Sequence, residues 1–153
     1  MKSLFSQHVL YTCGTGMRSF NEFLDIVQYY GVNQVCDVRR FPKSRLPHFG
    51  REHIEESLKT NRITYHFLGE TLGGFRQGGY VTYTKTDSFR KGIAILEDLL
   101  KDNSVLIFCA EKLPWRCHRR FIGAHMEGLG YHVHHVIDKG KIWVMDEAKH
   151  GLL

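Results

Sequence analysis

The sequence predicts a single α/β domain over residues 1–153, with a mainly parallel sheet, helices on both faces and a C-terminal edge strand. Short runs rich in β-branched and aromatic residues alternate with segments whose apolar residues recur at helical spacing. The 153 residues, 42% of them hydrophobic, suit one domain with its own core. Parallel strands need crossovers, and right-handed crossovers place helices outside the sheet. Ligands of such folds bind beyond the carboxyl ends of the strands.

Six segments have the length and composition of strands. They lie at 9–11, 34–38, 64–67, 104–108, 132–137 and 142–145. The last follows a turn at Lys139 and Gly140, so we expect it to form an edge hairpin with the strand before it.

Four segments have helical periodicity. The clearest begins at Phe20, where Ser19 and Glu22 form a capping box, and it ends before Gly31. The others are predicted around 54–58, at 89–100 behind the cap candidate Asp87, and at 117–128. The apolar face of the last would comprise Cys117, Phe121, Ala124 and Gly128.

One long stretch, residues 69–86, is rich in glycine and shows neither helical nor strand periodicity. A segment of this length without regular structure is typically a lid or binding loop, and a disordered surface insertion is the alternative.

Composition narrows the classes of function. Lys and Arg number 21 against 16 Asp and Glu, a net charge of +5, which suits DNA or another phosphate-bearing ligand. Cys13, Cys36 and Cys109 fall within or at the ends of predicted strands, so a disulfide scaffold is not expected. The chain has neither a secretory signal nor an apolar run long enough to span a bilayer, so we expect a cytoplasmic protein without a membrane partner. The sequence does not indicate the oligomeric state.

The first strand leads into a glycine loop just before a helix. Gly14, Thr15 and Arg18 lie there, where backbone amides can hold a phosphate. Ser19 replaces the third glycine of a dinucleotide fingerprint, so no such cofactor is expected, and a simple tight turn is equally compatible with these residues.

The second strand ends at a carboxylate surrounded by cations. Asp37 precedes Arg39, Arg40, Lys43 and Arg45, which favour its ionised form. An ionised Asp37 is a candidate base, nucleophile or stabiliser of a cation, and a structural salt bridge is the alternative.

The fourth strand ends at Cys109 and leads into an arginine-rich helix with Pro114 at a plausible first position. Arg116, Arg119 and Arg120 lie near that helix start, where the macrodipole disfavours cations. Glu111 can offset one of them and a bound phosphate the rest, unless the arginines form a solvated face.

Cys109, Cys117 and His118 are also potential metal ligands. A zinc site needs four ligands, usually in pairs two to four residues apart, and these residues do not have that spacing. We expect neither a metal nor a cofactor.

Three motifs together give a family resemblance. They are Gly14-Thr15, Asp37-Val38-Arg39 with Phe41-Pro42, and Cys109-Ala110-Glu111 with Cys117-His118-Arg119. In this order they resemble the domain of unknown function 488 family over nearly the whole chain. Some archaeal members are linked to excision of oxidised pyrimidines from DNA, which implies a DNA-repair role. The chain is more loosely similar to rhodanese-like domains, through Asp37-Val38-Arg39 and the strand ending at Cys109, which implies sulfur transfer.

The leading hypothesis is a DNA glycosylase-like hydrolase, and a thiol enzyme using Cys109 is the first alternative. A binding module without catalysis is the second. For the glycosylase, Asp37 would be catalytic with Glu111 or Glu70 as second carboxylate. The phosphate-binding set would be Gly14, Thr15, Arg18, Arg39, Arg40, Lys43, Arg45, Arg116, His118 and Arg119. The stacking set would be Phe75, Tyr80 and Trp115.

Overall fold

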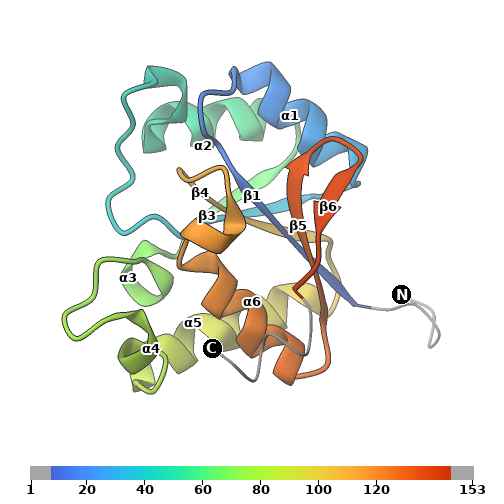
Figure 1. Ribbon diagram of the computed structural model, residues 1–153. Coiled ribbons are helices and arrows are strands. Elements are labelled where there is room, and N and C mark those ends of the chain that lie inside the picture. Colours follow the sequence, from blue (N-terminus) through green and yellow to red (C-terminus); the bar gives the residue numbers. More distant parts are fainter. Residues whose placement is uncertain (1–7, 146–153) are drawn as a thin grey trace.

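The computed structural model describes residues 8–145 and contains one six-stranded sheet (Figure 1). Its strands are β1 Val9–Gly14, β2 Gln34–Asp37, β3 Thr64–Phe67, β4 Val105–Cys109, β5 His132–Asp138 and β6 Lys141–Trp143. Their order in the sheet is β3-β2-β4-β1-β5-β6, parallel except for β6, which pairs antiparallel with β5. The predicted fold class is confirmed. β1 runs three residues beyond its prediction because it lies between β4 and β5, and it pairs Gly14 with Cys109.

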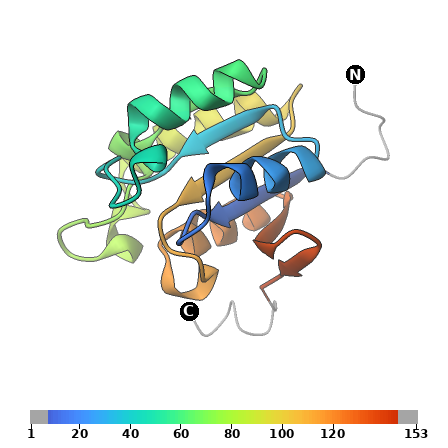
Figure 2. The same ribbon diagram turned by 90° about the horizontal axis from the view of Figure 1, so that it is seen from above.

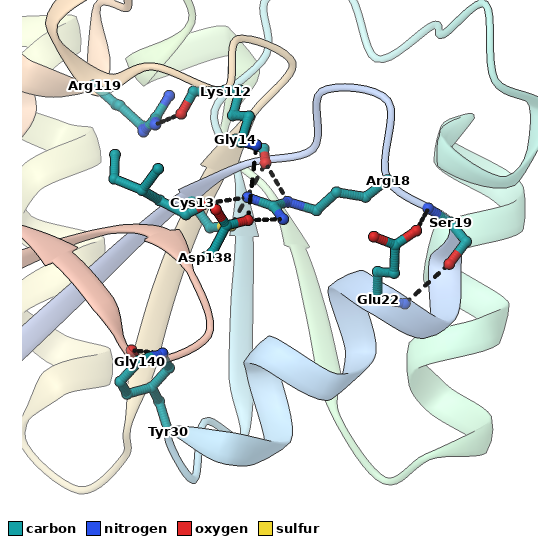
Figure 3. Close-up of polar contacts among 11 residues, drawn as sticks. Cys13, Gly14, Arg18, Ser19, Glu22, Tyr30, Lys112, Arg119, Asp138 and Gly140 are labelled. Atoms are coloured by element: carbon teal, nitrogen blue, oxygen red, sulfur yellow. Dashed lines mark hydrogen bonds and ion pairs between the residues drawn. The ribbon is translucent and has the colours of Figure 1, made fainter.

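The four predicted helices are present between the strands, and two short ones are added within residues 69–86. They are α1 Phe20–Tyr29, α2 Arg51–Thr60, α3 Gly69–Leu72, α4 Tyr80–Tyr83, α5 Asp87–Leu100 and α6 Arg119–Gly128, with short 3-10 helices η1 Pro47–Phe49 and η2 Pro114–Arg116. The capping box of α1 is present: Glu22 N donates to Ser19 Oγ at 3.1 Å, and Ser19 N to Glu22 Oε1 at 3.0 Å (Figure 3). None of the helices within residues 8–145 combines the length and the apolar character needed to cross a membrane.

The cap of α5 differs from the prediction. Asp87 is already helical, and the preceding Thr86 has extended backbone, so its Oγ1 accepts from Phe89 N at 3.2 Å. Asp87 instead pairs with Arg90 on the surface.

Each face of the sheet has its own core. Along β4, Ile107 and Cys109 face the core beneath α5 and α6, whereas Leu106 and Phe108 face that beneath α1 and α2. Alternate strand side chains point to opposite faces, so a fully buried strand supplies both cores. Figures 1 and 2 show the two helical layers on either side of the sheet.

The prediction of an irregular lid over residues 69–86 is wrong at both helical parts of that stretch, 69–72 and 80–83. α3 and α4 form there because Leu72 and Tyr83 are buried against Phe89 and its neighbours in the α5 core. The Tyr83 hydroxyl donates to the Thr71 carbonyl at 2.7 Å and ties the two short helices together. Residues 73–79 and the short turn at 84–86 lie outside both helices.

The last helix begins later and buries a different face than predicted. Pro114 does take a first helical position, but in η2, and the extended backbone of Cys117 separates η2 from α6. Starting α6 at Arg119 changes which side chains face inward. The buried residues of α6 are Arg119, Ile122, Gly123 and Met126.

Candidate functional site

A cavity of about 570 Å³ lies at the carboxyl ends of β2 and β4, which are neighbours in the sheet. The loop after β2 lines it with Arg39, Arg40, Phe41 and Lys43, and residues 73–79 contribute Gly74 and Phe75. The segment after β4 contributes Cys109, Ala110, Glu111, Arg116, Cys117 and His118. The pocket therefore forms where ligands of parallel α/β sheets bind.

The glycine loop after β1 is not a phosphate cradle. Thr15 N donates to the Cys109 carbonyl at 2.8 Å, and Gly16 N to the Ala110 carbonyl at 2.9 Å. A Cβ on Gly14 would lie 1.8 Å from the Glu111 carbonyl oxygen, so only glycine permits this approach. The loop supports the segment after β4, and these amides are not available to an anion.

Arg18 is likewise used within the fold. Its Nε donates to the Gly14 carbonyl at 3.1 Å, its Nη1 to Asp138 at 3.0 Å, and its Nη2 to the Ile137 carbonyl. Figure 3 shows this buried side chain between the end of β1 and the end of β5. Arg18 therefore joins two strand ends and does not face the pocket.

Asp37 forms a closed structural salt bridge. It is fully buried, and Arg39 Nε and Nη2 donate to its two oxygens at 2.8 and 2.7 Å. The Tyr65 hydroxyl adds a bond of 2.5 Å, and burial together with the Asp37 charge raises the pKa of Tyr65. Arg39 also reaches the Phe49 carbonyl at 2.7 Å. Asp37 does not line the pocket, so the salt-bridge alternative fits this residue and a catalytic role does not.

Arg119 is fully buried and holds the loop after β4 in place through hydrogen bonds. It donates to Thr12 Oγ1 at 3.1 Å, to Cys109 Sγ at 3.0 Å, and to the carbonyls of Glu111 and Lys112 at 2.6 and 3.0 Å. These bonds use four of the five guanidinium N–H groups, and Arg119 is not among the residues that line the pocket. These partners are all neutral, and a buried cation without a nearby negative charge is costly.

Cys117 supplies that negative charge. Its pKa falls from an ordinary 9.0 to about 4, first because the Cys109 thiol hydrogen-bonds to it and then through His118 and the Arg119 charge. Arg119 N donates to Cys117 Sγ at 3.4 Å, and His118 Nδ1 lies 3.6 Å from the same sulfur. The lowered pKa and these contacts favour the thiolate form of Cys117 on the pocket wall.

Cys109, the nucleophile of the predicted thiol-enzyme alternative, has a raised pKa and not a lowered one. Burial raises the pKa of Cys109, and the neighbouring Cys117 thiolate raises it further. Cys109 ends the central strand β4, whereas Cys117 is closer to the start of α6, where the macrodipole favours negative charge. The two thiols thus have opposite roles, one donor and one thiolate.

His118 is oriented by a carbonyl across the pocket. Its Nε2 lies 2.8 Å from the Val38 oxygen, which can only accept, so this nitrogen carries the proton. Nδ1 is thereby directed at Cys117, and the Tyr80 ring packs 5.1 Å from the imidazole. This geometry pairs the His118 ring with the Cys117 sulfur, as an acceptor from the thiol or, when both ring nitrogens carry protons, as a donor to the thiolate.

Three cations on the pocket wall have no counterion among the described residues. Arg40, Lys43 and Arg116 make no side-chain ion pair or hydrogen bond within residues 8–145, and the same holds for the Glu111 carboxylate. Arg45 is exposed and lies outside the lining. Of the predicted phosphate ligands, Arg40, Lys43 and Arg116 are the ones that face the pocket unpaired.

The three residues predicted to stack on a base do not lie together in the structure. Phe75 lines the pocket and is 89% exposed. The Tyr80 hydroxyl bonds the Leu72 carbonyl at 2.7 Å, and Trp115 packs against Trp143, so neither lines the pocket. Phe41, which the sequence reasoning did not select for stacking, lies beside Phe75.

Cys117 was also missed as a reactive group. The signal was present, because it stands next to His118 and close before a helix, a setting that stabilises thiolates. Assigning Cys117 to the apolar stripe of that helix hid this signal. Within residues 8–145, no three His, Cys, Asp or Glu side chains are grouped to hold a metal ion.

The fold and site define an α/β domain with a thiolate and unpaired cations in one pocket at the carboxyl edge of its sheet. The chain belongs to the family described as Domain of unknown function DUF488, whose model matches residues 19–126. No curated protein and no solved structure matches the chain.

Proposed function

We propose that the protein is a thiol-dependent enzyme in which Cys117 attacks an anionic substrate bound in the pocket. The observation that carries this proposal is the position of the Cys117 sulfur, on the pocket wall and in contact with Arg119 N–H and His118. A thiol with a pKa of about 4 is ionised at neutral pH and needs no separate base. Arg40, Lys43 and Arg116 supply positive charge for the substrate.

The reaction we propose is transfer of a sulfane sulfur. The Cys117 thiolate attacks the outer sulfur of a thiosulfate-like donor, the S–S bond of the donor breaks, and sulfite leaves with the electron pair. An acceptor thiolate or cyanide then attacks the outer sulfur of the Cys117 persulfide, and the Cys117 thiolate leaves. The Cys109 thiol, which is the largest cause of the lowered pKa of Cys117, stabilises that thiolate when it is released.

Selective alkylation tests the nucleophile. At pH 5.5 iodoacetamide should label Cys117 in the native protein, since an ordinary thiol is almost fully protonated there. Cys117→Ser should abolish the labelling, a loss of at least about a thousandfold in rate, whereas Cys109→Ser keeps a hydroxyl donor and should retain it. Cys13 and Cys36 are fully buried and serve as internal controls. Labelling of Cys109 alone, or of no thiol before denaturation, would refute the assignment.

Mass spectrometry after incubation with thiosulfate tests the reaction. We expect one added sulfur on Cys117 of the wild type, removed by cyanide with release of thiocyanate, and none in Cys117→Ser. A reactive Cys117 that never acquires sulfur would reject sulfur transfer while leaving the thiol nucleophile in place.

Base excision from DNA is a second candidate, favoured by Glu111. This carboxylate lines the pocket without an ion pair, beside unpaired cations suited to phosphates, and it is the only carboxylate among the lining residues. Excision from duplexes carrying oxidised or deaminated pyrimidines, lost in Glu111→Gln and kept in Cys117→Ser, would favour this candidate over the thiol enzyme. Absence of excision by the wild type on these duplexes would reject it.

A further inference from the structure

Phe75 combines two features that the fold alone does not require. Its backbone lies in the left-handed region, at φ 56°, which bulky side chains rarely adopt. Its ring is 89% exposed, so no burial compensates for that backbone conformation. Strain of this kind is typical of residues positioned for a ligand.

The backbone on both sides of Phe75 is fixed by contacts. A Cβ on Gly73 would lie 2.3 Å from the Gly69 carbonyl oxygen, and one on Gly74 would lie 3.1 Å from His118 Nδ1. On the other side, Arg76 donates to the Gly73 carbonyl at 2.9 Å and lies over a tyrosine ring at 4.0 Å. Phe75 is therefore presented by a well-packed loop, and its exposure does not result from a loosely held chain.

Phe41 joins Phe75 from a different loop. It is 63% exposed, and the two ring centroids are 6.1 Å apart with planes inclined by 32°. The rings pack on each other and leave most of their remaining surface to solvent at the pocket rim. Exposed aromatic faces of this kind are what planar rings stack on.

Unpaired cations stand next to this platform. Arg40 and Lys43 flank Phe41 in the sequence, and Arg116 lines the pocket from the segment after β4. A ligand that uses both features carries a flat ring and a negative charge within one small unit. The cavity of about 570 Å³ has the size of a small-molecule site.

We propose that the outer part of the pocket is a subsite for a nucleotide, with its base on Phe41 and Phe75 and its phosphate near Arg40, Lys43 and Arg116. This inference rests on the proposed function, since it names the chemical class of a ligand that is held beside the Cys117 centre. Sites of this composition bind nucleotides through stacking and phosphate contacts with little dependence on the base.

Calorimetric binding to the full chain carrying Cys117→Ser tests the subsite separately from the chemistry. We expect adenosine and uridine 5′-monophosphate to bind at least about tenfold more tightly than ribose 5-phosphate or inorganic phosphate, because one stacked base contributes that much. Phenyl phosphate should bind more weakly than either nucleotide. Ribose 5-phosphate binding as tightly as the nucleotides would overturn the proposal, and equal binding of phenyl phosphate would reassign the site to aryl phosphates and overturn it too.

Substitutions at the platform complete the test. Phe75→Ala should lower nucleotide affinity about tenfold, while Tyr29→Ala, which removes an aromatic side chain that is 59% exposed and outside the pocket lining, should leave it unchanged. Phe75→Gly should lose affinity equally and yet melt at the same or a higher temperature, because glycine adopts the left-handed backbone without strain. Unchanged affinity in both Phe75 variants would refute the subsite. If nucleotides bind as expected but Cys117 proves unreactive, the subsite stands and the thiol chemistry fails.

Discussion

Two buried ionic clusters stand at the carboxyl ends of neighbouring strands, and they differ in what remains unsatisfied. After β2, Asp37 and Arg39 neutralise each other, and Tyr65 occupies a further acceptor position of the carboxylate. After β4, Arg119 is bonded to neutral groups, and its balancing charge is the thiolate of Cys117 on the pocket wall. The first cluster is complete without a ligand, whereas the second exposes a nucleophile to one.

The comparison shows that a buried charge pair at a strand end is not by itself a sign of catalysis. Salt bridges that are fully bonded internally perturb titration as strongly as active sites do. What separates these clusters is access, because the pocket reaches Cys117 and His118 but not Asp37. The following predictions test whether the clusters can be changed independently.

Asp37→Asn should have the largest effect on stability. The substitution leaves the Arg39 guanidinium buried without its counterion, which typically costs about 3–5 kcal/mol of unfolding free energy. Denaturant unfolding measures this cost, and alkylation of Cys117 at matched temperature should be unchanged. The control is Asp138→Asn, whose half-exposed carboxylate pairs with Arg18 and should contribute no more than about 1 kcal/mol. A stable Asp37→Asn protein that has lost activity would restore Asp37 as a catalytic residue.

The Cys117 thiolate should make stability depend on pH. Between the folded pKa of about 4 and the ordinary value of 9.0, the unfolded chain binds a proton that the folded protein lacks. Unfolding free energy should therefore rise with pH across this window, by up to about 1.4 kcal/mol per unit, and this contribution is lost as pH falls through 4.

Unfolding titrations from pH 5 to 8 on the wild type and Cys117→Ser isolate this contribution as a difference in slope. The matched control is Cys36→Ser, because burial raises the pKa of Cys36 and places its titration above this range. Parallel slopes in the wild type and Cys117→Ser would mean that the Cys117 thiol is protonated at neutral pH.

Local sequence signals predicted most of the fold. Three features could be predicted because each depends on residues close together in the chain. They are the alternation of strands and helices, the capping box at Ser19 and the C-terminal hairpin. The lid prediction failed because Leu72 and Tyr83 are buried against α5, a tertiary contact that residues 69–86 do not reveal by themselves.

The site was predicted in place but not in detail. Its position at the carboxyl edge follows from topology, and Arg40, Lys43, Arg116 and Phe75, which were chosen by charge and ring type, all line the pocket. Some charged groups are hydrogen-bonded within the fold by residues distant in the sequence, as Asp37 is by Tyr65 and Arg119 by Thr12. No local pattern distinguishes a bonded arginine from a free one, so Arg18 and Arg119 were assigned to phosphate.

The smallest expected effect concerns the cations that line the pocket. It tests whether they act on Cys117 in the cluster after β4. Arg116 is exposed on the pocket wall and has no ion-pair partner within the part of the chain that the structure describes, so it should raise the rate at which the anion iodoacetate reacts with Cys117, relative to neutral iodoacetamide. Arg116→Gln should lower this ratio about threefold at low salt, since an exposed charge contributes less than about 1 kcal/mol and is screened over roughly 10 Å at 0.1 M salt. Arg45→Gln removes an exposed arginine outside the lining and should leave the ratio unchanged at equal net charge. Equal losses in both variants would mean that the overall charge of +5 attracts anions, and that Arg116 has no specific role at the pocket.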